Sequence, residues 1–397
     1  MEHLKISLLL AATTLFLNSQ CSTQSLPSIA GSVQMSEGWK PVVYLVQPRN
    51  FAEITSNYSG LILDSALVNK DGHFSFSKVS LPTDPMLVQL CIQKTGNRFP
   101  NQLMDEDPLM ANYMPVVVRK SEQLRFTAVA ANFQASFELK NPAAENQALL
   151  QLRDIRHRSF EQEQSLLTGG DHSSESELMQ VEDALLRTRK PLMDFADTTR
   201  SWWAALVATR WVSPASDYER VPEFLFRQCT RWSKEAPGQA MTTQLCALGN
   251  REKLPVLTGD PFPNTTLPMV QGDTILLYSL LGKQLTIVDL WASWCAPCRK
   301  ENREVLEPLW KQYQRQGLQI LGYSIDSSPA AWKAAIAKDG AIWPHASHLQ
   351  GDDAPLLATL RISTIPANFI LDAQGNVIAK NLHGEALRAF VKGHLER

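Results

Sequence analysis

The chain has 397 residues, which is more than a domain with a single hydrophobic core usually contains, and this length predicts two or three domains. Its formal net charge of −2 gives no reason to expect nucleic acid or a strongly acidic surface as a partner. Six cysteines are too few for a disulfide scaffold of this size, and a hydrophobic content of 44% is ordinary for a globular protein.

Residues 1–21 have the pattern of an export signal. Lys5 precedes an apolar run at 6–17, which is too short to span a bilayer easily but suits a signal peptide, and no other stretch is apolar enough to cross a membrane. Cys21 follows and resembles the cysteine that is acylated at a lipoprotein cleavage site. Gln20 stands where such sites prefer a small residue, so a plain signal peptide cut near Ser22 is the alternative. In both cases we expect an exported protein, either periplasmic or held at a membrane by a lipid.

Residues 22–140 have the pattern of a small antiparallel β domain. Runs such as IAGSVQ, PVVYLVQ, MLVQLCIQ, MPVVVRK and LRFTAVA alternate or are continuously apolar, and turn residues separate them. Asp71-Gly72 lies between two further runs and predicts a tight hairpin there. Short strands with turn signals predict a sandwich or a barrel. Cys91 lies within an apolar run, so we expect a buried packing thiol.

Residues 141–252 have a helical pattern, with a loop expected at 168–177. Three apolar stripes recur at helical spacing, the third of them just after Pro191: Leu149, Leu152 and Ile155; Leu178, Val181 and Leu185; Leu192, Phe195, Thr199, Trp202 and Leu206. We expect the tryptophans of this region to pack between helices rather than to form an aromatic binding surface: Trp202, Trp203, Trp211 and Trp232. The sequence leaves open whether Cys229 and Cys246 form a disulfide.

Residues 253–397 follow a boundary rich in Pro, Gly and Asp at 251–265. Strands and helices then alternate, which predicts a mixed α/β sheet. The expected order is a strand ending at 291, a helix to about 317, the strand LQILGYSI, a helix around Trp332, a short segment at 343–344, a helix at 355–360, the strands ANFILD and NVIAKNL, and a last helix from Glu385.

The segment at 286–301, TIVDLWASWCAPCRKE, carries the strongest chemical signal. An apolar strand ends there, and a helical pattern follows, so Cys295 is expected where a helix begins. Unpaired N–H groups and a partial positive charge at that place stabilise a thiolate, which is the form that attacks disulfides. Cys298 is close enough in sequence to close a small ring with Cys295 or to expel a partner bound to it.

A zinc site is the alternative use of such a cysteine pair. Zinc sites of this type need four ligands, usually including a second close pair of Cys or His. The sequence has no second such cysteine pair, and the spacing of His345 and His348 is common by chance. We therefore expect a redox pair and no metal.

The motif between its strand and its helix resembles the active site of a thioredoxin-fold thiol–disulfide oxidoreductase, more narrowly of the TlpA/ResA-like branch of the AhpC/TSA-like redoxins. The lead-in GDPFP with LPMVQGDTILLYSLLGK resembles the added N-terminal hairpin of that branch. The resemblance covers about residues 256–397. GLILDSALVNKDGHFSF resembles the β domain of unknown function that precedes such modules in exported bacterial lipoproteins. The implied fold class is an α/β thioredoxin fold at the C-terminus, preceded by the β domain and the helical region.

The resemblance implies a role for each residue around the motif. Cys295, exposed at the first helical turn, would be the nucleophile, and the more shielded Cys298 would resolve the mixed disulfide. Ala296 and Pro297 lie between them and would tune the redox poise. Trp294 is expected to pack beside the motif, where it is a candidate for substrate contact.

Thr364-Ile365-Pro366 is the second signature of the resemblance. In the family the bond before this proline is cis and faces the cysteine pair, and the backbone of the preceding residue pairs with the substrate chain. We therefore expect a cis Ile365–Pro366 bond, although cis is the rarer form of X-Pro bonds. Without the resemblance, Pro366 would simply open an edge strand.

Asp289 interrupts the apolar strand on the face shared with Ile287 and Trp291. An unpaired buried carboxylate costs on the order of several kcal/mol, so it should be protonated or have a function. It lies six residues before Cys295, where thioredoxins place a buried acid, and the resemblance implies a proton acceptor for Cys298. The alternative is a strand-end Asp bonded to the backbone.

These expectations describe an exported thiol–disulfide oxidoreductase that reduces disulfides of other exported proteins and has no cofactor beyond the Cys295–Cys298 disulfide. Its electrons would come from a membrane donor or another thioredoxin-like protein. A thiol peroxidase is one alternative, but such enzymes need a nearby upstream Pro and a Thr or Ser where Ala292 stands. A non-enzymatic surface-anchored binding protein is another, and the intact cysteine pair counts against it.

Overall fold

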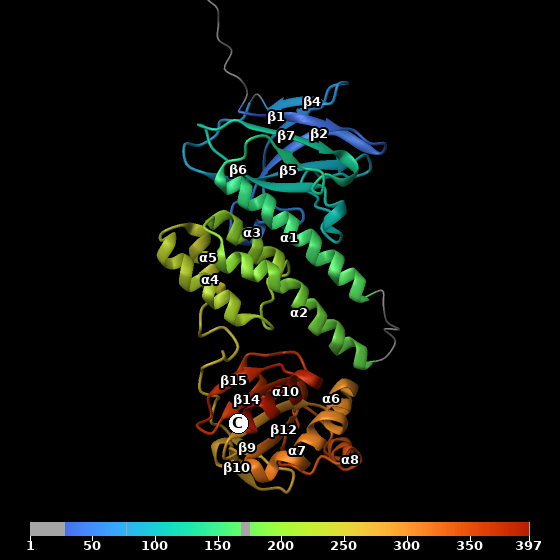
Figure 1. The fold of residues 1–397 in the computed structure, drawn as a ribbon, viewed down its shortest axis with the longest axis vertical. Helices are drawn as coiled ribbons and strands as arrows, with labels where there is room; N and C mark the ends of the chain where they lie inside the picture. The colour runs from blue at the N-terminus through green and yellow to red at the C-terminus, as the bar shows by residue number, and fades with distance from the viewer. Residues whose placement is uncertain (1–27, 77, 168–174, 397) are drawn as a thin grey trace, which may run out of the picture.

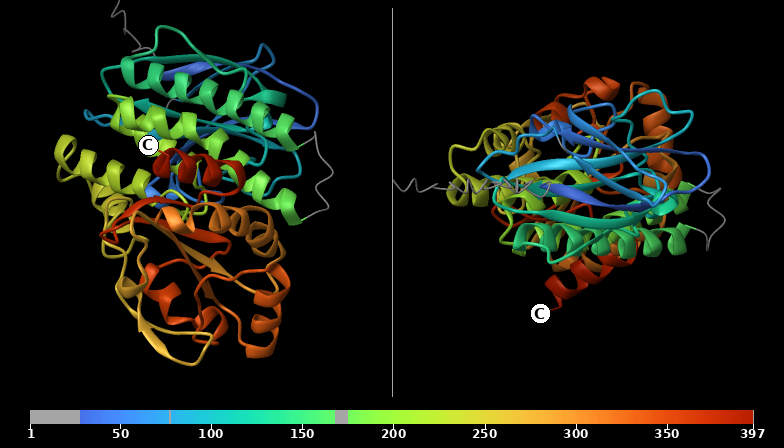
Figure 2. Two further views of the ribbon diagram at one scale, coloured as in Figure 1. Left: turned by 60° about the horizontal axis from the view of Figure 1, so that its bottom comes forward. Right: turned by 90° about the horizontal axis from the view of Figure 1, so that it is seen from above.

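The computed structural model of the chain describes residues 28–76, 78–167 and 175–396, and it describes side chains outside 166–185. The export signal expected at 1–21, including Cys21, lies outside the described residues. A β sandwich, a layer of helices and an α/β domain follow one another along the long axis of the molecule (Figure 1). A second view shows the same order (Figure 2). Over the described ranges, no helix combines the length and the apolar character that a membrane crossing requires.

Two four-stranded sheets form the sandwich, in the orders β4-β1-β7-β8 and β3-β2-β5-β6. Their inner faces share one apolar core. The strands confirm the short runs expected from the sequence: β1 (Ile29–Gln34), β2 (Trp39–Gln47), β3 (Leu61–Leu67), β4 (His73–Phe76), β5 (Met86–Lys94), β6 (Tyr113–Val118), β7 (Leu124–Val129) and β8 (Glu138–Leu139).

Two expectations for the sandwich are wrong. The domain is not purely antiparallel, because β1 and β7 pair in parallel. The turn at Asp71-Gly72 does form, closed by the Asn69 N–H on the His73 carbonyl at 2.9 Å, but it joins no hairpin. β3 and β4 belong to opposite sheets. Turn residues fix the local geometry, whereas each strand pairs where its apolar face can be buried.

Five helices of the described ranges make the middle layer: α1 (Ala144–Leu167), α2 (Glu175–Thr198), α3 (Trp202–Val212), α4 (Pro222–Glu235) and α5 (Ala240–Leu248). The loop expected to reach residue 177 is shorter at its end, because α2 begins at Glu175. The third apolar stripe is divided: Pro191 lies inside α2, and the Ser201 side chain caps α3 by accepting the Ala204 N–H. A capping serine after an apolar run therefore starts a new helix. The stripe at 178–185 lies among side chains that are not described.

The sandwich and the helices share a single hydrophobic core, which extends from Ile29 to Leu257. Buried polar contacts cross between them, since the indole of Trp211 donates to the Tyr113 hydroxyl at 2.9 Å. Trp232 is also buried, and the expected packing role of the tryptophans is confirmed. Cys91 is a buried free thiol, as expected. The question left open by the sequence is answered by a disulfide between Cys229 of α4 and Cys246 of α5.

The C-terminal domain is an α/β thioredoxin fold, as expected. Its five-stranded sheet has the order β13-β12-β11-β14-β15, with β11 parallel to β12 and antiparallel to β14. Separate apolar cores cover its two faces. The elements are the hairpin β9 (Thr266–Pro268) and β10 (Thr274–Leu276), then β11 (Leu285–Trp291), α6 (Ala296–Glu301), α7 (Glu307–Tyr313), β12 (Leu318–Ser324), α8 (Pro329–Asp339), β13 (His345–Ala346), α9 (Pro355–Leu360), β14 (Ala367–Asp372), β15 (Val377–Lys380) and α10 (Gly384–Leu395). A π-helical turn at 302–306 connects α6 to α7.

Candidate active site

The cysteine pair lies where the central strand β11 gives way to α6. Every residue of β11 is buried, and Cys295 occupies the N-cap position of α6. The Cys298 N–H points at the Cys295 sulfur at 3.3 Å, so an unpaired helix N–H is available to stabilise charge on that sulfur. Pro297 stands in the first helical turn, where its missing N–H costs nothing. The two cysteines form a disulfide, which is the oxidised state of the pair.

Cys295 is more exposed than Cys298, as expected. The expectation that Cys295 itself is exposed is wrong, because the residue is buried. Its exposed fraction is 6%, against 1% for Cys298. Its sulfur is bonded to Cys298, and both residues pack in the apolar core on that face of the sheet. Trp294 was expected to pack beside the motif, and this is wrong, because 62% of its surface is exposed next to Cys295 in the chain.

The main chain before Cys295 is held by charged groups that the sequence analysis missed. Asp326, which is 1% exposed just beyond β12, accepts the Ser293 N–H at 2.9 Å and also its hydroxyl. Arg299 of α6 donates to the Ser293 carbonyl at 3.1 Å and forms an ion pair with the buried Asp339 of α8. These contacts fix the turn that presents the cysteine pair.

The Ile365–Pro366 peptide bond is cis, which confirms the expectation from the resemblance. It directly precedes β14, whose first residue, Ala367, is opposite Leu290 of β11. The cis bond and the cysteine pair therefore lie at the same end of the neighbouring strands β11 and β14. Among the described residues, neither the N–H nor the carbonyl of Ile365 has a hydrogen-bond partner. The main chain of Ile365 can accept an added strand.

Asp289 is buried in β11, with 3% of its surface exposed. Burial raises the pKa of this carboxyl well above its ordinary value, and the negative charge of Glu301 raises that pKa further. In the described part of the chain, no hydrogen bond reaches the Asp289 side chain. The alternative of an Asp bonded to the backbone therefore gains no support.

Glu301 is a second buried acid at this place, and the sequence analysis missed it. Cys298 and Glu301 are the two buried residues of α6, and residues three apart lie on one side of a helix. The Glu301 carboxylate accepts the Gly384 N–H at 3.2 Å. His383 lies 3.9 Å from it, and burial, aided by the charge of Arg220, lowers the pKa of this imidazole to about 4. His383 is therefore neutral at neutral pH and brings no positive charge beside Glu301.

The two histidines considered for zinc have other partners. His345 is buried, with Nε2 3.1 Å from the Ala341 carbonyl, and Nδ1 of His348 lies 2.7 Å from the Tyr323 hydroxyl. The described residues contain no cluster of three or more His, Cys, Asp or Glu side chains placed to hold a metal ion.

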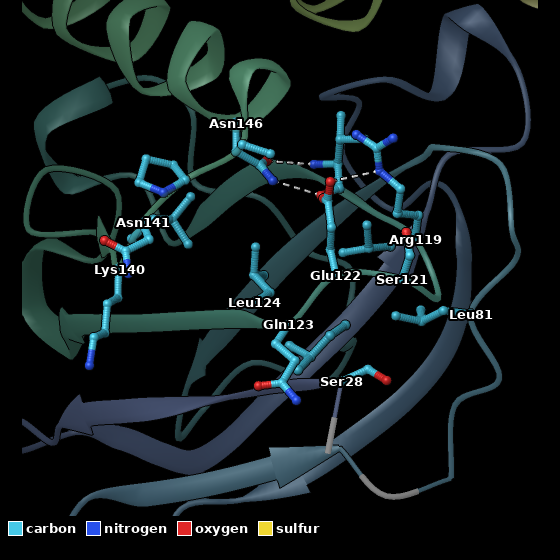
Figure 3. Close-up of a pocket in the computed structure, with 16 residues that line it drawn as sticks. Ser28, Leu81, Arg119, Ser121, Glu122, Gln123, Leu124, Lys140, Asn141 and Asn146 are labelled. Carbon is cyan, nitrogen blue, oxygen red and sulfur yellow. Dashed lines mark hydrogen bonds and ion pairs between the residues drawn. The ribbon is translucent and has the colours of Figure 1, made fainter. Parts of the chain in front are cut away.

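A cavity of about 300 Å³ lies far from the cysteines, in the β sandwich (Figure 3). Several of its polar lining groups are already engaged. Asn146 bonds both the N–H and the carbonyl of Val117 at 2.8 Å, and Arg119 pairs with Glu122 at 2.9 Å. The chemistry of this protein therefore centres on the cysteine pair.

Comparison with known proteins points to the same domain. Residues 258–380 match the AhpC/TSA family. The thiol-disulfide oxidoreductase ResA of Bacillus thuringiensis (strain Al Hakam) is 26% identical over 148 residues, which cover 37% of this chain and 81% of that protein. The thiol:disulfide interchange protein DsbE of Pseudomonas fluorescens biotype C is 30% identical over 122 residues, covering 30% of this chain and 63% of that one. A solved thiol-disulfide oxidoreductase from Bacteroides fragilis NCTC 9343 is 29% identical, covers 34% of this chain and 98% of its own, and has a TM-score of 0.32.

Proposed function

From the membership of the C-terminal domain in the TlpA/ResA-like thioredoxin-fold oxidoreductases, we propose that this enzyme is exported and reduces disulfides of other exported proteins. One observation carries the proposal: Cys295 caps the helix α6, is bonded to Cys298, and lies at the same end of the sheet's strands as the cis Ile365–Pro366 bond. Attack, resolution and substrate pairing all require these groups at one place.

The proposed reaction begins with both cysteines reduced. The Cys295 thiolate attacks one sulfur of the substrate disulfide, forms a mixed disulfide and releases the other substrate sulfur as a thiolate. Cys298 then attacks Cys295, which frees the second substrate thiol and leaves the Cys295–Cys298 disulfide. Two electrons pass from the enzyme to the substrate, and no cofactor beyond the cysteine pair is needed. A dithiol donor, in the membrane or thioredoxin-like, reduces the pair again.

Substrate binding is assigned to the surface around the pair. An extended substrate segment pairs with the free main-chain groups of Ile365, next to Pro366, as an added strand. Trp294 offers an exposed aromatic surface beside it. Ala296 and Pro297 bring no charge between the cysteines, so the thiolate of Cys295 depends mainly on the helix N-terminus.

Asp289 is assigned the proton of Cys298. Resolution requires this buried thiol to become a thiolate, and a carboxylate with a raised pKa can take up its proton near neutral pH. Cys298 and Glu301 occupy the buried side of α6, and Glu301 is close enough to Asp289 to raise its pKa. The negative charge of Glu301 therefore strengthens Asp289 as a base.

Export is part of the proposal and rests on residues 1–21, which end at Cys21. The mature protein is expected to begin at an acylated Cys21 or near Ser22. Mass spectrometry of the protein from the exported fraction checks this, and an intact Met1 terminus in that fraction would contradict it.

Two assays side by side test the reaction. The reduced protein should reduce the disulfides of insulin, and it should consume hydrogen peroxide no faster than free thiols do. Rapid peroxide consumption without insulin reduction would favour the thiol peroxidase, although Ala292 supplies no hydroxyl near Cys295. Neither activity would favour the non-enzymatic binding protein.

A further inference from the structure

The loop at 213–221, between α3 and α4, reaches from the helical layer onto the cis-proline loop, Ser363–Pro366. One oxygen of the Glu219 carboxylate accepts the Ser363 N–H at 3.0 Å and the Ser363 hydroxyl at 2.7 Å. The other oxygen accepts the Thr364 N–H at 3.1 Å. Hydrogen bonds to a charged acceptor are stronger than neutral ones, so these three fix the chain just before Ile365.

The next residue of the same loop holds the other side. The Arg220 guanidinium donates to the Pro366 carbonyl, with both terminal nitrogens at 3.4 Å. Glu219 and Arg220 therefore form hydrogen bonds with main-chain groups before and after Ile365. The N–H and carbonyl of Ile365 itself stay unpartnered among the described residues. The cis-proline loop is fixed at both ends and open in the middle, where the substrate would pair.

Further contacts join the two domains beside this loop. Glu223, at the start of α4, forms an ion pair with Lys380 of β15 at 2.7 Å, and the Lys380 side chain is 9% exposed. The Lys380 ammonium also donates to the Val256 carbonyl at 2.9 Å. Tyr218, directly before Glu219, is buried and donates to the Thr209 carbonyl at 3.1 Å. Tyr218 therefore anchors the loop to the helical layer, and the Glu223–Lys380 pair joins the two domains outside the loop.

We propose that Glu219 and Arg220 are positioning residues that hold the cis-proline loop in the conformation that binds a protein disulfide substrate. The proposal rests on the proposed function. A loop that is already ordered loses less conformational entropy when it pairs with an added strand, so substrate binding is tighter. A small aromatic disulfide does not need that pairing, because it meets only the Cys295 sulfur. The helical layer thus contributes to recognition of protein substrates but not to thiol chemistry.

The test compares variants of the full mature chain. Glu219→Ala and Arg220→Ala remove the two contacts, and Glu219→Gln keeps the shape while weakening the acceptor. Glu223→Gln is the matched control, because it weakens the same domain interface without touching the cis-proline loop. Each variant is measured for its thermal midpoint, KM and kcat with insulin, its second-order rate with 5,5′-dithiobis(2-nitrobenzoate), and hydrogen exchange of the peptide that contains Ser363–Ile365.

The expected result for Glu219→Ala is a KM for insulin raised about tenfold, as loss of charge-assisted hydrogen bonds predicts, with kcat and the small-disulfide rate within twofold of wild type. Exchange in the Ser363–Ile365 peptide should be faster by about tenfold or more. Glu219→Gln should lie between, and Glu223→Gln should match wild type.

Three results would overturn the proposal. A folded Glu219→Ala protein with unchanged KM and unchanged exchange would show that the contact positions nothing. An equal loss with insulin and the small disulfide would show a general structural role. A lower KM would show that the contact obstructs the substrate. If wild type itself reduces neither disulfide, the proposed function has failed and this proposal fails with it; an active wild type with an unaffected Glu219→Ala variant sinks only this proposal.

Discussion

The carboxyl groups of Asp289 and Glu301 are both buried at the active-site helix, and the charge of Glu301 adds to burial in raising the pKa of Asp289. The two carboxyl groups differ in the hydrogen bonds that they accept. Glu301 accepts a main-chain N–H from Gly384, whereas no hydrogen bond from the described residues reaches Asp289. Ionisation of Asp289 therefore lowers the stability of the folded state, and the following two predictions depend on this.

Asp289→Asn should stabilise the protein in a pH-dependent way. The pKa of Asp289 is raised in the folded state, so the folded state holds its proton from about pH 4, the unfolded value, up to the folded pKa. Across that window wild-type stability falls with rising pH, by up to about 1.4 kcal/mol per pH unit, and the amide removes this slope. Thermal melts of both proteins should coincide near pH 3 and separate as the pH rises. A gain that is the same at every pH, or a loss, would contradict the account.

The same variant should slow resolution more than attack. Cys295 alkylation in the reduced protein should stay nearly unchanged, faster than at Cys298 and with an apparent pKa below the ~8.5 of a free thiol. Mixed disulfide should accumulate during turnover, since Cys298 lacks its proton acceptor. Stopped-flow kinetics with a fluorescent mixed-disulfide substrate separate the two steps. Unchanged resolution in a less stable variant would make Asp289 a structural residue.

A fragment that begins at Leu254 should fold and keep most of its exchange with a small disulfide. The two cores of the C-terminal sheet are built from Val256 and residues after it, and both cysteines lie in one of these cores. The fragment lacks Glu219, so its reduction of insulin should fall by about tenfold through KM. Circular dichroism establishes folding, and the two assays follow. A folded fragment that is inactive with the small disulfide as well would show that the helical layer completes the chemical site.

The chemical centre could be read from the sequence because its signals are local. Cys295 and Cys298 follow an apolar strand and precede a helical pattern, and Asp289 is conspicuous as an acid in that strand. The cis bond at Pro366 came from the resemblance and not from the residues themselves. The β sandwich was also legible from its alternating runs, but not which strands pair.

The missed residues share a reason. Glu301 stands in the charged run RKENRE, which reads as a solvated helix face, and only the packing of α6 shows that Glu301 is buried. Glu219 and Arg220 lie in a polar loop about 145 residues before Ser363, and local patterns carry no signal for contacts at such separation. The role of Asp326 could not be predicted either, since its partners Ser293 and Ser324 lie at the ends of two different strands.

The most direct measurement of the central claim is a trap with Cys298→Ser in the full mature chain. Without the resolving thiol, Cys295 should attack an insulin disulfide and remain joined to insulin by a mixed disulfide. Mass spectrometry of the digested adduct should place that bond on Cys295. Cys295→Ser should form little or no adduct under the same conditions. Equal adducts on the two variants, or no adduct with Cys298→Ser, would contradict the assignment of Cys295 as the nucleophile of a disulfide reductase.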